Sequence, residues 1–166
     1  MSIALIALLL AQGTETYNDE KHGLSVTYPS AMVFQNKESG TGWHLFCYKK
    51  EEVSDFNANL NLHAKVQTIE IKDTKDFGDK NMDHLKTNFA EFRLCIPPMP
   101  VKVNGKEFYK LLYSAEYDKK SFLILQYFYY DPANKMGYVF TALDLLSKDL
   151  SNISKLEQVI LTIKFK

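Results

Sequence analysis

The sequence predicts an α+β fold: an antiparallel meander sheet of about six strands, covered by one mid-chain helix and one C-terminal helix. Three observations support this prediction. Apolar residues alternate with polar ones over several short segments, turn residues separate those segments, and the apolar period changes to three and four residues in only two places. The 166 residues contain no internal repeat or linker, which indicates a single domain.

The chain opens with an apolar run, Ile3–Ala11. This run is too short for a transmembrane helix, which needs about 20 residues, so we expect no transmembrane anchor. Small residues at Ala11 and Gly13 fit the exit of a signal peptide. We therefore predict a signal peptide over 1–13, a single α+β domain over 14–166, and a periplasmic or secreted protein. The alternative is a buried N-terminal strand or helix.

The first strands are predicted by alternation. Leu24–Tyr28 alternates up to Pro29, Trp43–Tyr48 is a second apolar run entered through glycines, and Leu60–Val66 alternates with polar residues. The period then becomes helical in Met82, Leu85, Phe89 and Phe92. That stripe predicts an amphipathic helix from near Asp79 to a point before Pro97.

The second half begins with a hairpin signal, because Asn104-Gly105 suits a tight type I′ turn between two strands. The strand after it alternates from Tyr109 to Tyr117. The next run, Phe122–Tyr130, is apolar or aromatic on both alternating sets except at Gln126, which is typical of a strand covered on both faces. A turn at 131–134 then leads into a further strand.

The last element is predicted to be helical. Ser154 and Glu157 have the spacing of a capping box. The apolar stripe of this helix consists of Leu156, Val159, Ile160 and Ile163.

The order of these elements and three short motifs resemble the Mog1/PsbP-like fold. The motifs are Gly23–Pro29, which ends in Tyr-Pro; Asn59–Leu62, which contains Asn-x-Asn; and Val159–Phe165, which ends near an apolar-Phe pair. The aromatic residue often found after Tyr-Pro is replaced here by Ala31-Met32. The resemblance implies a non-catalytic accessory protein, since the superfamily includes extrinsic photosystem subunits, a Ran-binding protein, envelope lipoproteins and secretion chaperones. None of these roles has a motif that transfers residue by residue.

The residues themselves point to no enzyme. The sequence has no nucleophile elbow, zincin helix, phosphate-binding loop or dinucleotide fingerprint, and we expect neither a cofactor nor a metal site. The four histidines are scattered, at His22, His44, His63 and His84. The chain has 20 basic and 20 acidic residues, a balance that argues against nucleic-acid binding.

Two cysteines, Cys47 and Cys95, allow a disulfide if the protein is exported, and a bridge over such a loop contributes on the order of 4 kcal/mol. The alternative is two buried free thiols. A thiol hydrolase that uses either cysteine with a distant histidine is a further alternative without a local signature.

Tyrosines cluster on three successive strands, where they form either an exposed binding face or, as we favour, a core beneath the helices. The function that these observations favour is a secreted or periplasmic binding module that docks on a protein partner through a sheet edge or loops. A small exported hydrolase is the first alternative. An intracellular transport or secretion adaptor is the second, if the leader belongs to the fold.

Overall fold

The computed structural model describes residues 13–36, 42–46, 56–146 and 150–166. The predicted leader therefore lies outside the described residues, as does the end of the second predicted strand. The strands are β1 (Thr14–Asp19), β2 (Leu24–Pro29), β3 (Val33–Asn36), β4 (Trp43–Phe46), β5 (Asn59–Val66), β6 (Ala90–Val103), β7 (Lys106–Tyr117), β8 (Lys120–Asp131), β9 (Met136–Leu145) and β10 (Lys164–Phe165). The helices are α2 (Thr74–Asn88) and α3 (Ser151–Ile160).

The strands form two antiparallel sheets. The larger has seven strands in the order β3-β4-β5-β9-β8-β7-β6, and the smaller has three in the order β1-β2-β10. The predicted α+β class, the antiparallel sheet and the two helices are confirmed. The predicted count of about six strands is too low. It left out β3, which has only four residues. It also left out β1, which is polar along most of its length, and β10, which has only two residues. Neither β1 nor β10 carries an apolar alternation that sequence can reveal.

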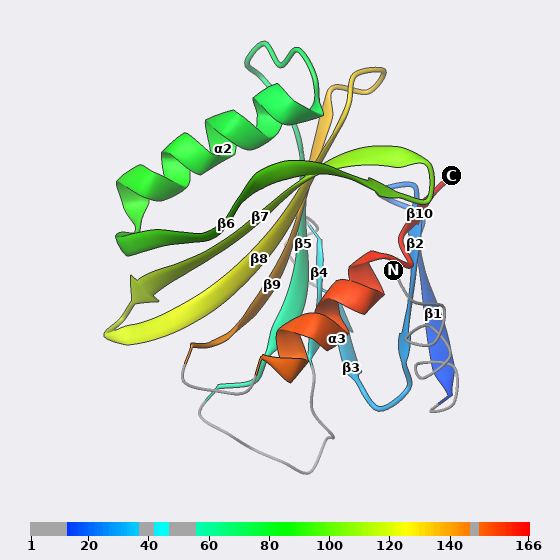
Figure 1. The fold of residues 1–166 in the computed structure, drawn as a ribbon. Helices are drawn as coiled ribbons and strands as arrows, with labels where there is room; N and C mark the ends of the chain where they lie inside the picture. Colours follow the sequence, from blue (N-terminus) through cyan, green and yellow to red (C-terminus); the bar gives the residue numbers. More distant parts are fainter. Residues whose placement is uncertain (1–12, 37–41, 47–55, 147–149) are drawn as a thin grey trace.

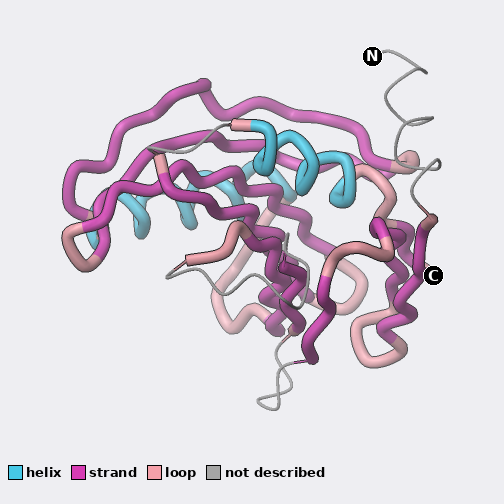
Figure 2. Tube along the Cα trace, turned by 90° about the horizontal axis from the view of Figure 1, so that it is seen from below, coloured by secondary structure: helices cyan, strands magenta, loops and turns pink. Residues whose placement is uncertain are grey.

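The two helices lie on opposite faces of the large sheet (Figure 1; Figure 2). Helix α2 packs on β6, β7 and β8, whereas α3 packs on β8 and β9 and also contacts β2 of the small sheet. Strand β8 is consequently buried on both sides. Phe122, Ile124 and Phe128 belong to the core under α2, while Leu125 and Tyr127 belong to the core under α3. The prediction of a doubly covered strand is confirmed.

Helix α2 begins and ends earlier than its apolar stripe predicts. It begins at Thr74 because the Asp73 side chain caps it, with Oδ1 accepting a hydrogen bond from the Asp76 backbone N–H at 2.7 Å. It ends at Asn88, so the predicted extension toward Pro97 is wrong. Phe92 lies instead on β6, where its ring packs 4.9 Å from the ring of Tyr113. The stripe correctly predicted which side chains pack against the core, but Phe92, its last member, does so from a strand and not from the helix.

The tight hairpin is confirmed between β6 and β7. Asn104 and Gly105 both have positive φ angles, 46° and 84°, as a type I′ turn requires. Val103 and Lys106 are the cross-strand pair that flanks the turn.

The predicted capping box of α3 is wrong. The helix begins at Ser151, and its N-cap, Leu150, makes no side-chain capping bond. Ser154 therefore lies within the helix. The Glu157 side chain contacts Lys110 and Tyr127, and not a backbone N–H at the start of the helix as in a capping box. The predicted apolar stripe is confirmed for Leu156, Val159 and Ile160, which are buried on the helix. Ile163 is also buried, but it lies beyond the end of the helix at Ile160.

Candidate functional site

Strand β6 forms a free edge of the large sheet, since β7 is its only partner strand in the part of the chain that the structure describes. Three large apolar side chains on it are exposed: Leu94 by 45%, Ile96 by 39% and Met99 by 45%. Monomeric proteins rarely leave such residues grouped on one element without a function. We call these three residues the β6 edge surface.

Register shifts in the β6–β7 ladder place this surface on both faces of the sheet. Leu94 pairs with Tyr113, which belongs to the core under α2. Ile96 pairs with Leu112, which packs against the core under α3. Since directly paired residues of an antiparallel ladder point to the same face, the exposed side chains form a ridge that a partner can contact from either side.

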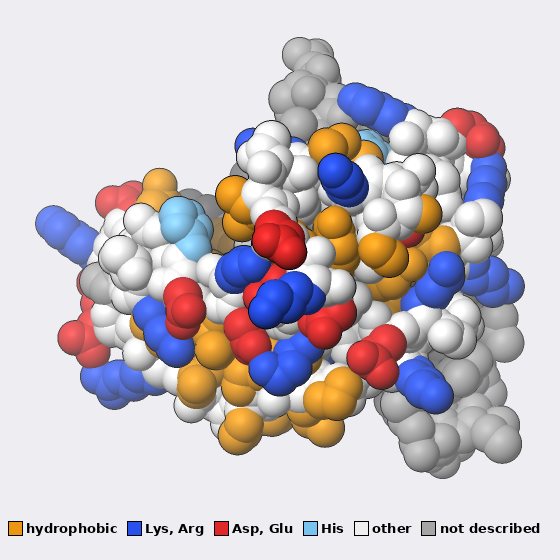
Figure 3. All heavy atoms as spheres, turned by 90° about the horizontal axis from the view of Figure 1, so that it is seen from above, with side chains coloured by type: hydrophobic (Ala, Val, Ile, Leu, Met, Phe, Trp, Pro, Cys, Tyr) orange, Lys and Arg blue, Asp and Glu red, His pale blue; other side chains and the backbone are white. Residues whose placement is uncertain are grey.

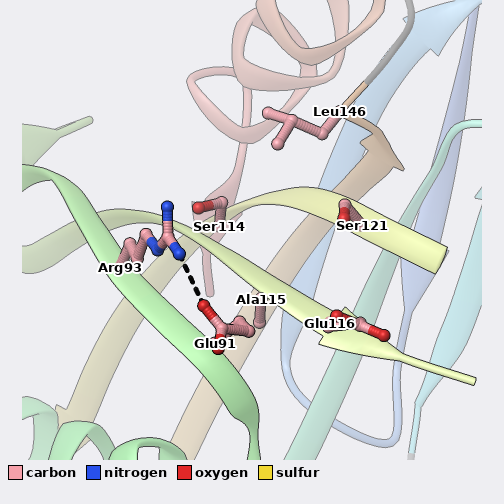
Figure 4. A pocket seen from close by; sticks show the side chains of 7 residues that line it. All are labelled: Glu91, Arg93, Ser114, Ala115, Glu116, Ser121 and Leu146. Carbon is pink, nitrogen blue, oxygen red and sulfur yellow. Dashed lines mark hydrogen bonds and ion pairs between the residues drawn. The ribbon is translucent and has the colours of Figure 1, made fainter. Parts of the chain in front are cut away.

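One side of the ridge adjoins a polar pocket of about 280 Å³ between β6, β7, the start of β8 and the residue after β9 (Figure 4). In it, Arg93 Nη2 lies 2.5 Å from Glu91 Oε2. The other lining residues are Ser114, Ala115, Glu116, Ser121 and Leu146. Both charged side chains of the pair are largely exposed, so the pair is weakly held and available to a partner's polar groups.

The other side adjoins an open hollow of about 580 Å³ beside the C-terminal end of α2. Phe89, Phe92 and Leu94 give it an apolar lining, and Lys86 and Glu91 stand at its margin. An apolar hollow bordered by charges is the arrangement found in protein docking surfaces.

The outer surface of α2 differs from this edge. Its charges are paired along the helix, with Lys75 Nζ 2.5 Å from Asp79 and Lys80 Nζ 2.8 Å from Asp76. Figure 3 shows acidic and basic side chains intermingled over the helix. This mixed charge presents no field of one sign.

Of the two cysteines, Cys95 is exposed on β6, and Cys47 lies outside the described residues. The disulfide between them therefore stays a prediction.

The four histidines lie in the turn after β1, on β4, on β5 and on α2. His22 is buried, with Nδ1 2.6 Å from Asp19 Oδ2, while His84 lies on α2 beside Asn88. Strands β4 and β5 do pair, but His44 stands opposite Asn61. Within the described residues, no three His, Cys, Asp or Glu side chains gather as metal ligands, and no helix is long and apolar enough to cross a bilayer.

The tyrosines form a core, as the sequence analysis favoured. Among those of the three strands only Tyr117 is exposed, by 67%. Burial raises the pKa of Tyr113 and, together with a hydrogen bond to Glu157, that of Tyr127. Burial and the charge of Asp131 raise the pKa of Tyr138 to about 12. Apart from Tyr117, the tyrosines therefore do not form an exposed face.

Sequence reasoning missed the β6 edge surface because it assigned Phe92 to a helix. The sequence does contain the signal of a strand here, since Phe92, Leu94 and Ile96 alternate with Arg93 and Cys95 at the two-residue period of a strand.

Fold and surface together define a small α+β protein with an exposed apolar surface on a sheet edge. No protein-family model and no curated protein matches the sequence. Solved structures match it over nearly its whole length. Yeast (Saccharomyces cerevisiae) Ran-binding protein Mog1p is 11% identical, with 93% of this chain and 96% of that chain covered and a TM-score of 0.65.

Two further structures agree. Cyanobacterial PsbP from Synechocystis sp. PCC 6803 is 13% identical, with 93% and 94% of the two chains covered and a TM-score of 0.63. LpqN of Mycobacterium tuberculosis, a protein involved in cell envelope biogenesis, is 12% identical, with 100% and 98% covered and a TM-score of 0.63. This chain therefore has the Mog1/PsbP-like fold, as the resemblance implied.

Proposed function

We propose that this protein is a non-catalytic accessory module that docks on another protein through the β6 edge surface. The observation that carries the proposal is the exposure of Leu94, Ile96 and Met99 on a strand whose outer side has no partner strand among the described residues. Covering them with a partner removes apolar area from water at about 25 cal/mol per Å². The Ran-binding activity of the similarly folded Mog1p supports a protein partner.

We further propose that the protein is exported and that cleavage after Gly13 leaves 14–166 as the working domain. The apolar run Ile3–Ala11 with its small-residue exit supports this, as does the cell-envelope role of the similarly folded LpqN. Mass spectrometry of the protein from its own host tests it. A terminal peptide that starts at Thr14 is expected, and an intact leader would favour the intracellular adaptor.

Site-directed photocrosslinking in the host tests the docking surface. A photoreactive residue at Leu94 is expected to capture one stoichiometric partner, and the same residue at Ile69, which is 59% exposed at the other end of α2, is the matched control. The double variant Ile96→Asp/Met99→Asp, with the photoreactive residue kept at Leu94, is expected to abolish the capture without loss of folding, because both side chains are already partly in water. Capture from Ile69 alone, or capture unchanged in the double variant, would contradict the proposal.

A further inference from the structure

We propose that the segment Pro97–Lys102 is a ligand for a protein with an aromatic-lined, proline-recognising groove that carries an acidic group at one end. The segment has the sequence Pro-Pro-Met-Pro-Val-Lys, which has the form Pro-x-x-Pro-x-Lys. Such segments bind aromatic grooves in the polyproline II conformation. The inference rests on the proposed docking function and specifies the chemistry of the partner.

The β6–β7 ladder releases the first two residues of this segment, Pro97 and Pro98, from regular pairing, while residues 99–102 stay paired with β7. Ile96 pairs with Leu112 and Met99 pairs with Lys110, so two prolines on β6 oppose only Leu111 on β7. This is a bulge, and it lets adjacent prolines stand in a strand although neither has an N–H to donate.

The exposure of the prolines fits recognition from the outer side. Pro97 and Pro100 are exposed, whereas Pro98 between them is half-buried. Residues three apart lie on the same side of a polyproline II helix, since it has three residues per turn. The two exposed prolines therefore have the spacing that a proline-reading groove contacts.

The segment is held extended before any partner arrives. Each proline fixes its own φ near −65°, and the residue before each proline is confined to extended conformations. On its inner side the segment is anchored by the pairs of Met99 with Lys110 and Pro100 with Tyr109. Binding such a pre-ordered strand costs less conformational entropy than binding a free peptide.

Lys102 supplies the charge that orients the segment. It is exposed, it lies two residues after Pro100, and no ion pair of the described residues includes it. An ammonium at one end of the proline pair favours a groove with a carboxylate at the matching end. Prolines and a lysine on an edge strand also protect it against strand addition, and a binding test with a proline-recognising domain distinguishes the two roles.

The test uses the full chain and, as probes, a panel of purified SH3 domains that bind Pro-x-x-Pro-x-Lys or -Arg ligands. NMR titration of the ¹⁵N-labelled protein is expected to give saturable shifts in 99–103. Lys102→Gln is expected to weaken binding about tenfold, as the loss of one charge-assisted contact predicts. Lys120→Gln, an exposed lysine at the start of β8, is the matched control and is expected to bind like the unaltered protein.

The double variant Pro97→Ala/Pro100→Ala is expected to abolish the shifts. The double variant also changes an edge strand and could therefore fold poorly. In that case Lys102→Gln keeps the inference testable. The absence of saturable shifts with every probe, or equal binding by Lys102→Gln and Lys120→Gln, would overturn the inference.

A separate result distinguishes failure of this inference from failure of the proposed function. Photocrosslinking at Leu94 is repeated with an excess of a synthetic peptide of residues 97–103, which carries the proline motif without Leu94 and Ile96. If the peptide abolishes the capture, the result supports both the docking proposal and the proline-ligand inference. Capture that the peptide leaves unchanged overturns the proline-ligand inference and leaves the docking proposal standing, whereas no capture at all overturns the docking proposal.

Discussion

The carboxylate of Glu157 on α3 accepts a hydrogen bond from the hydroxyl of Tyr127 on β8 at 2.6 Å. The same oxygen lies 2.5 Å from Lys110 Nζ on β7, and the lysine stands 5.7 Å from the centre of the Tyr127 ring. These contacts fasten α3 to the sheet at a half-buried point, where a charge-assisted bond is stronger than at the surface.

Tyr127→Phe removes this bond while it retains the ring. We expect the free energy of unfolding to fall by about 1–2 kcal/mol, because a buried carboxylate loses one of its two partners. Urea denaturation measures the change. Tyr117→Phe, at an exposed tyrosine on β7, is the control, and an equal effect from both substitutions would contradict the role of Glu157.

Alkaline pH is expected to destabilise the protein through its buried tyrosines. Tyr113 and Tyr127 have a raised pKa in the folded state, so their contribution to stability is complete below the unfolded pKa of about 10 and is lost as the pH rises toward the folded pKa. Above pH 10 the unfolded chain releases these protons first, which costs about 1.4 kcal/mol per pH unit for each tyrosine.

Urea midpoints measured between pH 8 and about pH 11 should show this decline. The variant Tyr113→Phe should make the decline shallower, because one of the two tyrosines whose ionisation destabilises the fold is gone. A pH dependence identical to that of the unaltered protein would show that Tyr113 ionises equally in both states.

Gly78→Ala is expected to destabilise the fold although alanine favours helices. A Cβ at this position of α2 would lie 2.1 Å from Cδ1 of Tyr109, a ring buried in the sheet beneath. The gain in helix propensity is about 1 kcal/mol, and the strain of overpacking is about 1–3 kcal/mol, so strain wins. Thermal unfolding measures the balance, with Asp83→Ala on the exposed side of α2 as control; a stabilised Gly78→Ala variant would show that the Tyr109 ring moves freely.

Asp73→Ala removes the cap of α2. The expected loss is about 1 kcal/mol, because the Asp76 N–H loses its acceptor at the helix N-terminus. Helix content and urea midpoint test this prediction against Lys75→Ala, a substitution two residues on at an exposed position. An unchanged midpoint would mean that water replaces the cap without cost.

The prolines of β6 are also expected to keep the protein from self-association. Replacement of Pro97, Pro98 and Pro100 by Thr, Val and Thr restores three N–H donors to an open edge, which then becomes a template for strand pairing. Sedimentation velocity should show concentration-dependent oligomers. The control variant Pro132→Ala, in the turn after β8, should sediment like the unaltered protein. If the triple variant stays monomeric, the prolines do not protect the edge.

Local patterns were enough to predict the elements whose own residues decide their conformation. The Asn104-Gly105 turn formed where the sequence placed it, because those two residues tolerate positive φ better than others. Strand β8 was recognised because both of its alternating sets are apolar. In β5, Leu60, Leu62 and Ala64 are buried as predicted, although Val66 at its end is exposed.

Patterns failed where distant residues decide the outcome. Phe92 fits a helical stripe, but it lies on a strand, where its ring packs against the ring of Tyr113. Ser154 and Glu157 fit a capping box, but Lys110 and Tyr127 offer the glutamate stronger partners than a helix end.

The sequence by itself determined the fold class, the central hairpins and the existence of the two helices, since these depend on periodicity and turn chemistry within a few residues. Only the tertiary structure decided that β6 is an edge strand, that its prolines occupy a bulge, and that Leu94, Ile96 and Met99 remain exposed. The physical reason is that an edge is defined by the absence of a neighbouring strand, and strand order is a property of the whole sheet.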